Sequence, residues 1–118
     1  MELNEYQRKA MATCMPSCDN VSYMLLNLAA EVGELAGKIA KDIRKGNARI
    51  DNNELCLEFD GALDRLEEYK KELGDIIWQA FGVCTAFGWT AEEVAQGNLS
   101  KLADRDTRGV IDGDGDNR

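Results

Sequence analysis

Two pairs of carboxylates, each with its members three residues apart, are the part of this 118-residue sequence best suited to chemistry. They are Glu31-x-x-Glu34 and Glu72-x-x-Asp75. In a helix, residues i and i+3 lie about 60° apart around the axis and about 4.5 Å apart along it, so each pair shares one face. Four ionised acids beside a helix interface repel one another, and a hard divalent cation with oxygen ligands removes that cost. We therefore predict a magnesium site, with Mg²⁺ replaceable by Mn²⁺, held by Glu31, Glu34, Glu72 and Asp75.

A glycine lies inside each acid pair, at Gly33 and Gly74. Glycine destabilises a helix interior by about 1 kcal/mol relative to alanine, so we expect it to serve close helix approach or access for a ligand. The alternative for both pairs is an ordinary solvated helix face, because acids at this spacing are common. Because two matching pairs occur, each with a glycine inside, the metal site and the solvated face are about equally well supported.

The composition restricts what other chemistry is available. The sequence has no histidine, which excludes Ser-His-Asp and Cys-His catalysis, most zinc sites and the Glu-x-x-His pairs of di-iron bundles. Lys and Arg number 14 against 22 Asp and Glu, a net charge of -8, so a nucleic-acid partner is not expected. Catalysis must come from carboxylates, amines, hydroxyls or thiols.

Four helices, and no convincing strand, are expected to position the acids. The apolar spacing predicts them at about 3–13, 22–45, 60–87 and 90–105. The second helix carries one continuous apolar stripe made of Leu25, Leu28, Val32, Leu35, Ile39 and Ile43. Thr90 followed by Glu93 matches a capping box at the start of the fourth helix. Residues 48–59 lack a clean period and are expected to form a loop or an irregular insert.

These elements predict an all-α fold, an antiparallel bundle of about four helices in one compact domain over residues 1–118. From about residue 106 the chain is too rich in Gly and Asp for regular structure and should form a polar tail. Long amphipathic helices in so small a chain leave apolar stripes that a second subunit would cover. No apolar stretch is long enough for a membrane span and the N-terminus lacks a signal-peptide pattern, so a cytoplasmic location is expected.

The acid pairs, together with the later stretch Asn98-Leu99-Ser100-Lys101-Leu102-Ala103-Asp104-Arg105, resemble the MazG-like all-α nucleoside triphosphate pyrophosphohydrolases. The resemblance covers most of the chain, and the tail from Arg108 to Arg118 is similar to that of a phage-type or bacterial subgroup. The sequence departs from the family pattern at Ala30, where many members have a further Glu. It also has a longer stretch, residues 35–71, between the acid pairs than compact members have.

The resemblance implies hydrolysis of a nucleoside triphosphate, commonly a deoxynucleotide, between its α and β phosphates to give a monophosphate and pyrophosphate. It also implies a homo-oligomer, a dimer or tetramer, that serves nucleotide-pool housekeeping. Mg²⁺ on the four acids would neutralise phosphate charge and lower the pKa of a bound water for in-line attack. One acid, Glu34 by analogy, would instead orient or deprotonate that water, and the sequence leaves the choice among the four open.

Cationic, amide and aromatic side chains at helical spacings are candidates to contact the substrate. Lys38 follows the first acid pair by four residues, either as a catalytic cation or as half of an intrahelical ion pair with Glu34. The residues Asn98, Lys101 and Arg105 share one face of the fourth expected helix and match the family pattern as substrate-binding residues. A further candidate is Trp78, which would stack on the base, although a tryptophan on an apolar helix more often belongs to the core.

The main alternative function is a non-catalytic acidic helical binding module, including a DNA mimic, for which the net charge of -8 would be the working feature. In an enzyme the acids converge on one pocket opposite Lys and Arg, whereas in a mimic they spread over a convex surface. A calcium-binding interpretation of Asp112, Asp114 and Asp116 in the tail is rejected, because Asn117 occupies the position of the invariant glycine of an EF-hand loop.

Overall fold

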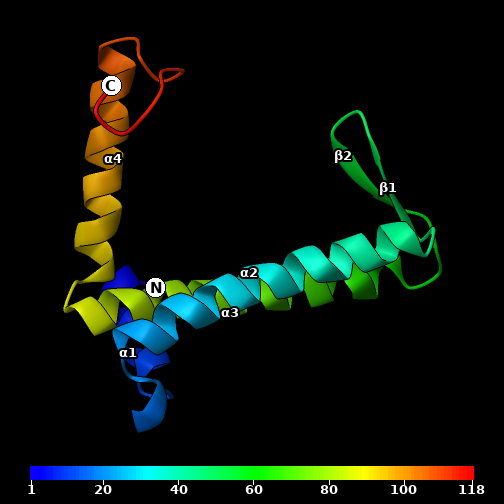
Figure 1. Cartoon of the computed structure of the whole chain (residues 1–118), viewed down its shortest axis with the longest axis horizontal. Helices are drawn as coiled ribbons and strands as arrows, with labels where there is room; N and C mark the ends of the chain where they lie inside the picture. Colours follow the sequence, from blue (N-terminus) through cyan, green and yellow to red (C-terminus); the bar gives the residue numbers. More distant parts are fainter.

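The computed structural model describes residues 1–118, which form four helices, one 3₁₀ turn and one β-hairpin (Figure 1). In chain order the elements are α1 (Leu3–Met11), η1 (Pro16–Cys18), α2 (Val21–Arg44), β1 (Ala48–Asp51), β2 (Glu54–Leu57), α3 (Ala62–Phe87) and α4 (Ala91–Thr107). The helical prediction is confirmed, since each helix begins and ends within two residues of its expected bounds. None of the four helices combines the length and the hydropathy that a membrane span requires.

The helices α2 and α3 run side by side in opposite directions and form the long arm of the molecule (Figure 1). Local signals set their ends. The Asn20 side chain accepts a hydrogen bond from the Tyr23 amide (2.8 Å) at the start of α2, while Gly88, at φ +76°, ends α3. The predicted apolar stripe of α2 is only partly covered, because Leu25 and Val32 are 46% and 49% exposed. Polar side chains also join the two helices, through Asn27–Gln79, Lys38–Glu72 and Asp42–Tyr69.

The helix α4 projects away from the α2–α3 pair instead of lying alongside it (Figure 1). Its first turn is held by α1, where Gln7 Oε1 accepts a hydrogen bond from the Ala91 amide (2.7 Å). The predicted cap is present as well, with Thr90 Oγ1 accepting from the Glu93 amide (3.1 Å). A four-helix bundle is therefore not closed within one chain.

The molecule is more open than the compact domain that the sequence predicts. Its radius of gyration is 17.7 Å, whereas a compact domain of this length has about 13.5 Å. Only 11 of the 118 residues are buried. Apolar periodicity identifies a helix face that needs cover, but it does not say whether the same chain supplies that cover.

The segment between α2 and α3 corrects the sequence prediction of a loop. The strands β1 and β2 pair antiparallel, with Ala48 opposite Leu57. Asn52 and Asn53 form the turn between them, at φ +50° and +64°. Asparagine tolerates the left-handed conformation that two-residue hairpin turns require, so the Asn-Asn pair was the local signal for this hairpin. The hairpin lies at the far end of the long arm from α1 and α4 (Figure 1).

The close helix contact in this fold occurs at Gly82 of α3 and not at the glycines of the acid pairs. Met24 of α2 is fully buried, and a Cβ on Gly82 would lie 2.8 Å from its Cε atom. Nothing lies within 4 Å of a Cβ built on Gly33 or Gly74. The prediction that these two glycines allow close approach of two helices is therefore wrong within one chain. Each glycine follows the first acid of its pair by two residues and so lies about 160° around the helix axis from it. This open space faces away from that acid, and access for a ligand stays a prediction.

Candidate metal centre between α2 and α3

Three of the four predicted metal ligands meet where α2 passes α3. Glu31 of α2 and Glu72 and Asp75 of α3 each place one carboxylate oxygen within 4.8 Å of the others. The i, i+3 spacing brings the two acids of α3 to one face, and the packing of the helices brings Glu31 opposite them. Glu72 is buried, Glu31 is half-buried and Asp75 is exposed, so the cluster reaches solvent on one side. This oxygen-only donor set fits Mg²⁺ and Mn²⁺, which keep water or phosphate ligands on an open side.

Burial and the neighbouring charges of this cluster change the pKa of Glu31. Burial raises the pKa of its carboxyl, and the hydrogen bond from Asn27 opposes that rise. The charges of Glu34, Asp75 and Glu72 raise the pKa further, which leaves it above its ordinary value. A divalent cation among these acids would favour the ionised carboxylates and remove their mutual repulsion.

Glu34, the fourth predicted ligand, does not join the three converging acids. It is exposed on α2, about one turn beyond Glu31. Its influence on the cluster is electrostatic, through the rise that its charge causes in the Glu31 pKa. The structure therefore brings together three of the predicted ligands and leaves Glu34 beside them, facing solvent.

Lys38 makes its ion pair across the helix interface and not along α2. Its Nζ atom donates a hydrogen bond to Glu72 Oε1 at 2.5 Å. The intrahelical pair with Glu34, the alternative weighed from the sequence, is not formed. The hydrogen bond to Glu72 raises the pKa of Lys38 above its ordinary value, although burial opposes it. Lys38 thus contributes a positive charge directly beside the acids.

Two amide side chains next to the cluster were missed by sequence reasoning. Asn27 Nδ2 donates to Glu31 Oε1 (3.1 Å) and to Gln79 Oε1 (2.8 Å). Gln79 is 1% exposed, and its Nε2 atom donates to the main-chain oxygen of Met24 (3.3 Å). The available signal was their spacing, since Asn27 lies four residues before Glu31 and Gln79 lies four after Asp75. Residues four apart share a helix face, so both amides continue the faces that carry the acids.

A second polar cluster joins α2 to α3 on the hairpin side of the acids. Asp42 is 2% exposed, accepts a hydrogen bond from the Tyr69 hydroxyl, and has its Oδ2 atom 3.2 Å from Arg65 Nε. That Nε makes no well-directed hydrogen bond, so the attraction between Arg65 and Asp42 is mainly one of charge. Burial and the hydrogen bond to Asp42 raise the pKa of Tyr69 to about 12. This cluster and the two amides hold the register of α2 against α3 on either side of the acids.

Trp78, a predicted contact for the base, lies against α1. Its Nε1 atom donates to the main-chain oxygen of Ala10 (3.1 Å) and lies 3.2 Å from Thr13 Oγ1, to which it also donates. The indole is half-buried in this position. Within one chain it therefore connects α1 to α3.

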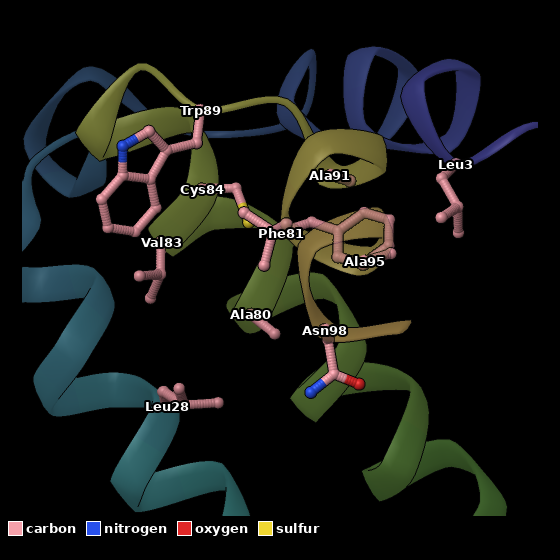
Figure 2. A pocket seen from close by; sticks show the side chains of 11 residues that line it. Leu3, Leu28, Ala80, Phe81, Val83, Cys84, Trp89, Ala91, Ala95 and Asn98 are labelled. Carbon is pink, nitrogen blue, oxygen red and sulfur yellow. The ribbon is translucent and has the colours of Figure 1, made fainter. Parts of the chain in front are cut away.

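An apolar pocket of about 510 Å³ lies at the α4 end of the long arm (Figure 2). All four helices contribute to its lining, among them Leu28 of α2 and Phe81 of α3. Ten of its eleven lining residues are hydrophobic, and the exception is Asn98 of α4. Leu28 lies three residues before Glu31, so the pocket is about one helical turn from the acid cluster.

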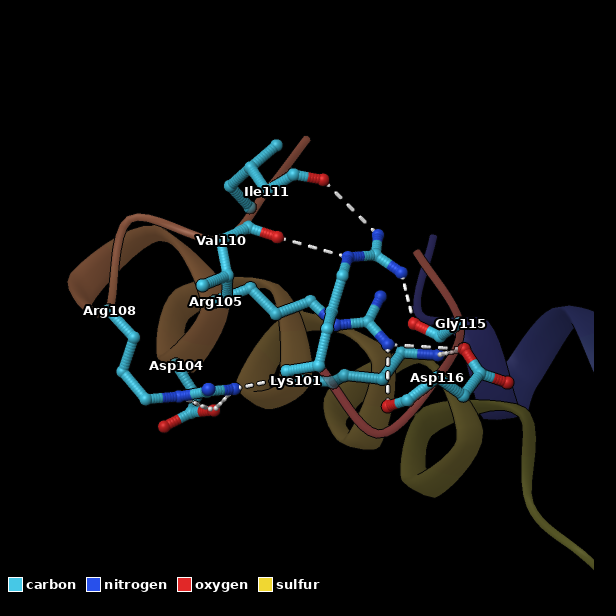
Figure 3. A network of polar contacts seen from close by, with 9 residues as sticks. Lys101, Asp104, Arg105, Arg108, Val110, Ile111, Gly115 and Asp116 are labelled. Carbon is cyan, nitrogen blue, oxygen red and sulfur yellow. Dashed lines mark hydrogen bonds and ion pairs between the residues drawn. The ribbon is translucent and has the colours of Figure 1, made fainter. Parts of the chain in front are cut away.

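Lys101 and Arg105 of α4 contact the tail of the chain (Figure 3). Arg105 is 5% exposed and donates from Nη2 to the main-chain oxygen (2.8 Å) and the carboxylate (3.1 Å) of Asp116. Lys101 Nζ lies 3.5 Å from the same carboxylate. The hydrogen bond from Arg105 lowers the pKa of Asp116. The Arg118 guanidinium also holds the tail, by donating to the Val110 carbonyl oxygen (3.0 Å).

Comparison with known proteins places this geometry in a family. The chain matches the family model described as the MazG nucleotide pyrophosphohydrolase domain over residues 20–110, a range that contains all three converging acids. It is 31% identical over 125 residues to the "Gene 37 protein" of Mycobacterium phage L5, in an alignment that covers 100% of both chains. No solved structure matches it significantly. The resemblance seen in the acid pairs is confirmed: the chain belongs to the MazG nucleotide pyrophosphohydrolase domain family.

Proposed function

We propose that this protein is a Mg²⁺-dependent enzyme that hydrolyses (deoxy)nucleoside triphosphates between the α and β phosphates. It releases a monophosphate and pyrophosphate and so serves nucleotide-pool housekeeping. The observation that carries the proposal is the convergence of Glu31, Glu72 and Asp75 in a chain of the MazG family. These acids meet beside the cationic Lys38, whereas the acids of a DNA mimic would spread over a convex surface.

Each charged residue of the cluster has a role in this proposal. Glu31, Glu72 and Asp75 hold the cation, which when bound supplies charge neutralisation and an acidified water. Glu34, exposed about one turn from Glu31, orients the attacking water or accepts its proton. Lys38, which donates to Glu72, stabilises negative charge on the phosphates from the same side. In phosphoryl transfer, a protein catalyses the reaction mainly by positioning the reacting groups and by stabilising charge in this way.

The apolar pocket next to the acids is the place we propose for the nucleoside. Its hydrophobic lining suits a base, and Asn98 supplies the polar group that can recognise it. Lys101 is the cation of α4 that we assign to the triphosphate, because its side chain is 42% exposed, whereas that of Arg105 is 6% exposed and donates two hydrogen bonds to Asp116. Stacking of the base on Trp78 would require the indole to leave α1, so Trp78 contributes to the site mainly by holding α1 in place.

The exposed apolar surface of the arm supports assembly into a homodimer or homotetramer. Leu25 and Val32 of α2, and Leu73 and Ile77 of α3, are large apolar side chains that the chain itself leaves exposed. A second α2–α3 pair packed on this surface would complete a four-helix bundle around the acids. Because α4 projects from its own arm, it would then be available to contact a neighbouring copy (Figure 1).

The proposed activity is tested with a panel of ordinary and modified ribo- and deoxynucleoside triphosphates, incubated with and without Mg²⁺. Pyrophosphate and orthophosphate are measured separately. We expect pyrophosphate and monophosphate in equal amounts, only with the metal, and little orthophosphate. Release of orthophosphate would indicate cleavage at the γ phosphate and contradict the proposed reaction. Absence of hydrolysis across the panel would favour an acidic binding module.

The Lys101→Ala variant tests the assignment of α4 to the substrate. Loss of a charge-assisted contact to a phosphate oxygen should reduce kcat/KM by roughly 10- to 150-fold. Mg²⁺ affinity measured by calorimetry without nucleotide should hardly change. The matched control is Lys70→Ala, which removes an exposed lysine of α3 that pairs with Glu67 away from the site. If Lys101→Ala and Lys70→Ala are equally active, α4 does not contact the triphosphate.

A further inference from the structure

Asn27 and Gln79 form a relay of hydrogen bonds that ends on a predicted metal ligand. We infer that these two amides are positioning residues which hold the Glu31 carboxylate in the orientation that metal binding requires. The inference rests on the proposed function of the acid cluster and adds to it two residues that the MazG acid pattern does not contain. Neither amide is expected to contact the substrate or the cation.

Gln79 is the fixed end of the relay. It is one of the two largest fully buried side chains in the chain, and its Nε2 atom donates to the main-chain oxygen of Met24 (3.3 Å). That bond determines which way round the carboxamide lies, so its Oε1 atom must face Asn27. A main-chain oxygen of α2 therefore sets the orientation of a side chain of α3.

Asn27 passes this orientation on to Glu31. Its Nδ2 group carries two hydrogens, and the structure uses both: one bond goes to Gln79 Oε1 (2.8 Å) and the other to Glu31 Oε1 (3.1 Å). With its amide group held by Gln79, Asn27 presents a donor to Glu31 from a set direction. Side chains that hydrogen-bond to a metal ligand commonly fix the orientation of that ligand in this way.

The cluster has a physical need for such a donor. The Glu31 carboxylate lies in a cluster with those of Glu72 and Asp75, and Asn27 Nδ2 donates a hydrogen bond to its Oε1 atom (3.1 Å). A carboxylate repelled by Glu72 and Asp75 would otherwise rotate away from them. Asn27 holds it near them, where the three oxygens lie within 4.8 Å of one another.

The test is a double-substitution cycle with Mn²⁺ affinity as the readout, measured by calorimetry without nucleotide. Asn27→Leu and Gln79→Met remove the polar atoms while nearly keeping side-chain volume. We expect Asn27→Leu to weaken Mn²⁺ binding about 10- to 100-fold and Gln79→Met to weaken it less. In the double variant the loss should equal that of Asn27→Leu alone, because Gln79 acts only through Asn27. Gln96→Met, an exposed amide of α4, is the control and should bind Mn²⁺ like the wild type.

Three results would overturn the relay. One is an Asn27→Leu variant that melts at a lower temperature but binds Mn²⁺ with wild-type affinity, because the amides are then only structural. The second is a double variant whose loss equals the sum of the two single losses. If Gln79→Met does not fold, the Mn²⁺ affinity of Asn27→Leu alone still tests the relay, because weakened binding supports it and wild-type affinity contradicts it. Wild-type protein that binds no Mn²⁺ is the third, and it would overturn the proposed function together with the relay.

Discussion

Replacing Asp75 with Asn is expected to abolish most of the activity while leaving the fold intact or more stable to heat. Asp75 is exposed, and its carboxylate is one of the three that converge. Loss of a metal ligand removes several kcal/mol of charge stabilisation, so kcat/KM should fall by at least about 100-fold. The Asp75 charge also raises the pKa of Glu31, so removing it relieves repulsion in the metal-free protein. Steady-state kinetics of pyrophosphate release, thermal unfolding without metal and Mg²⁺ calorimetry measure the three effects.

The Glu34→Gln variant separates a water-orienting acid from a ligand. Activity should again be mostly lost and the fold kept, but Mg²⁺ affinity should stay closer to the wild-type value, because Glu34 lies outside the converging group. Glu67→Gln is the matched control, since Glu67 is an exposed acid of α3 whose partner is Lys70. Near-wild-type turnover in both Asp75→Asn and Glu34→Gln would disprove the assignment of the metal site.

The largest loss of stability is expected from Asp42→Ala. This buried carboxylate accepts the Tyr69 hydroxyl and faces Arg65 Nε, and removing it leaves both groups at the α2–α3 interface without their partner. Because Arg65 is half-buried and keeps its ion pair with Glu68, the loss should be about 2–4 kcal/mol of unfolding free energy, less than for a fully buried ion pair. Tyr69→Phe, which removes only the hydroxyl, should cost about 1–3 kcal/mol. Urea titration of both variants measures the difference, and equal, small losses would show that this cluster does not hold the two helices together.

The same cluster predicts how stability changes at high pH. The pKa of Tyr69 is raised to about 12 in the folded chain, above its ordinary value of 10, so folding favours the protonated phenol. The stabilisation is therefore complete below about pH 10 and is lost as the pH rises through about 12. The melting temperature of the wild type should fall across this window more steeply than that of Tyr69→Phe. Parallel curves for the two proteins would contradict the raised pKa.

Local signals explain which parts of the fold could be predicted from the sequence. The helix bounds follow from apolar periodicity and from caps such as Asn20 and Thr90, which act within one turn. The acid pairs could be placed on helix faces for the same reason, because three-residue spacing is a property of a single helix. The hairpin was missed because two short strands lack a period, and its Asn52-Asn53 turn was the only strong signal.

The contacts between helices could not be predicted in the same way. Asn27 and Gln79 meet across 52 positions of the sequence, and neither residue type marks a metal site by itself. Lys38 could pair with Glu34 on α2 or with Glu72 on α3, and only the packing of the helices decides for Glu72. The burial of Arg105 under Asp116 depends on how the tail folds, which a stretch rich in Gly and Asp does not indicate.

The most direct test of the central claim is to locate Mn²⁺ by anomalous diffraction in crystals of the wild-type protein. The expected result is a peak bound by oxygens of Glu31, Glu72 and Asp75, with Glu34 reaching the ion at most through water. The peak should be absent from crystals of Asp75→Asn grown and soaked in the same way. A peak at another place in the molecule, with these three carboxylates left without an ion, would contradict the account.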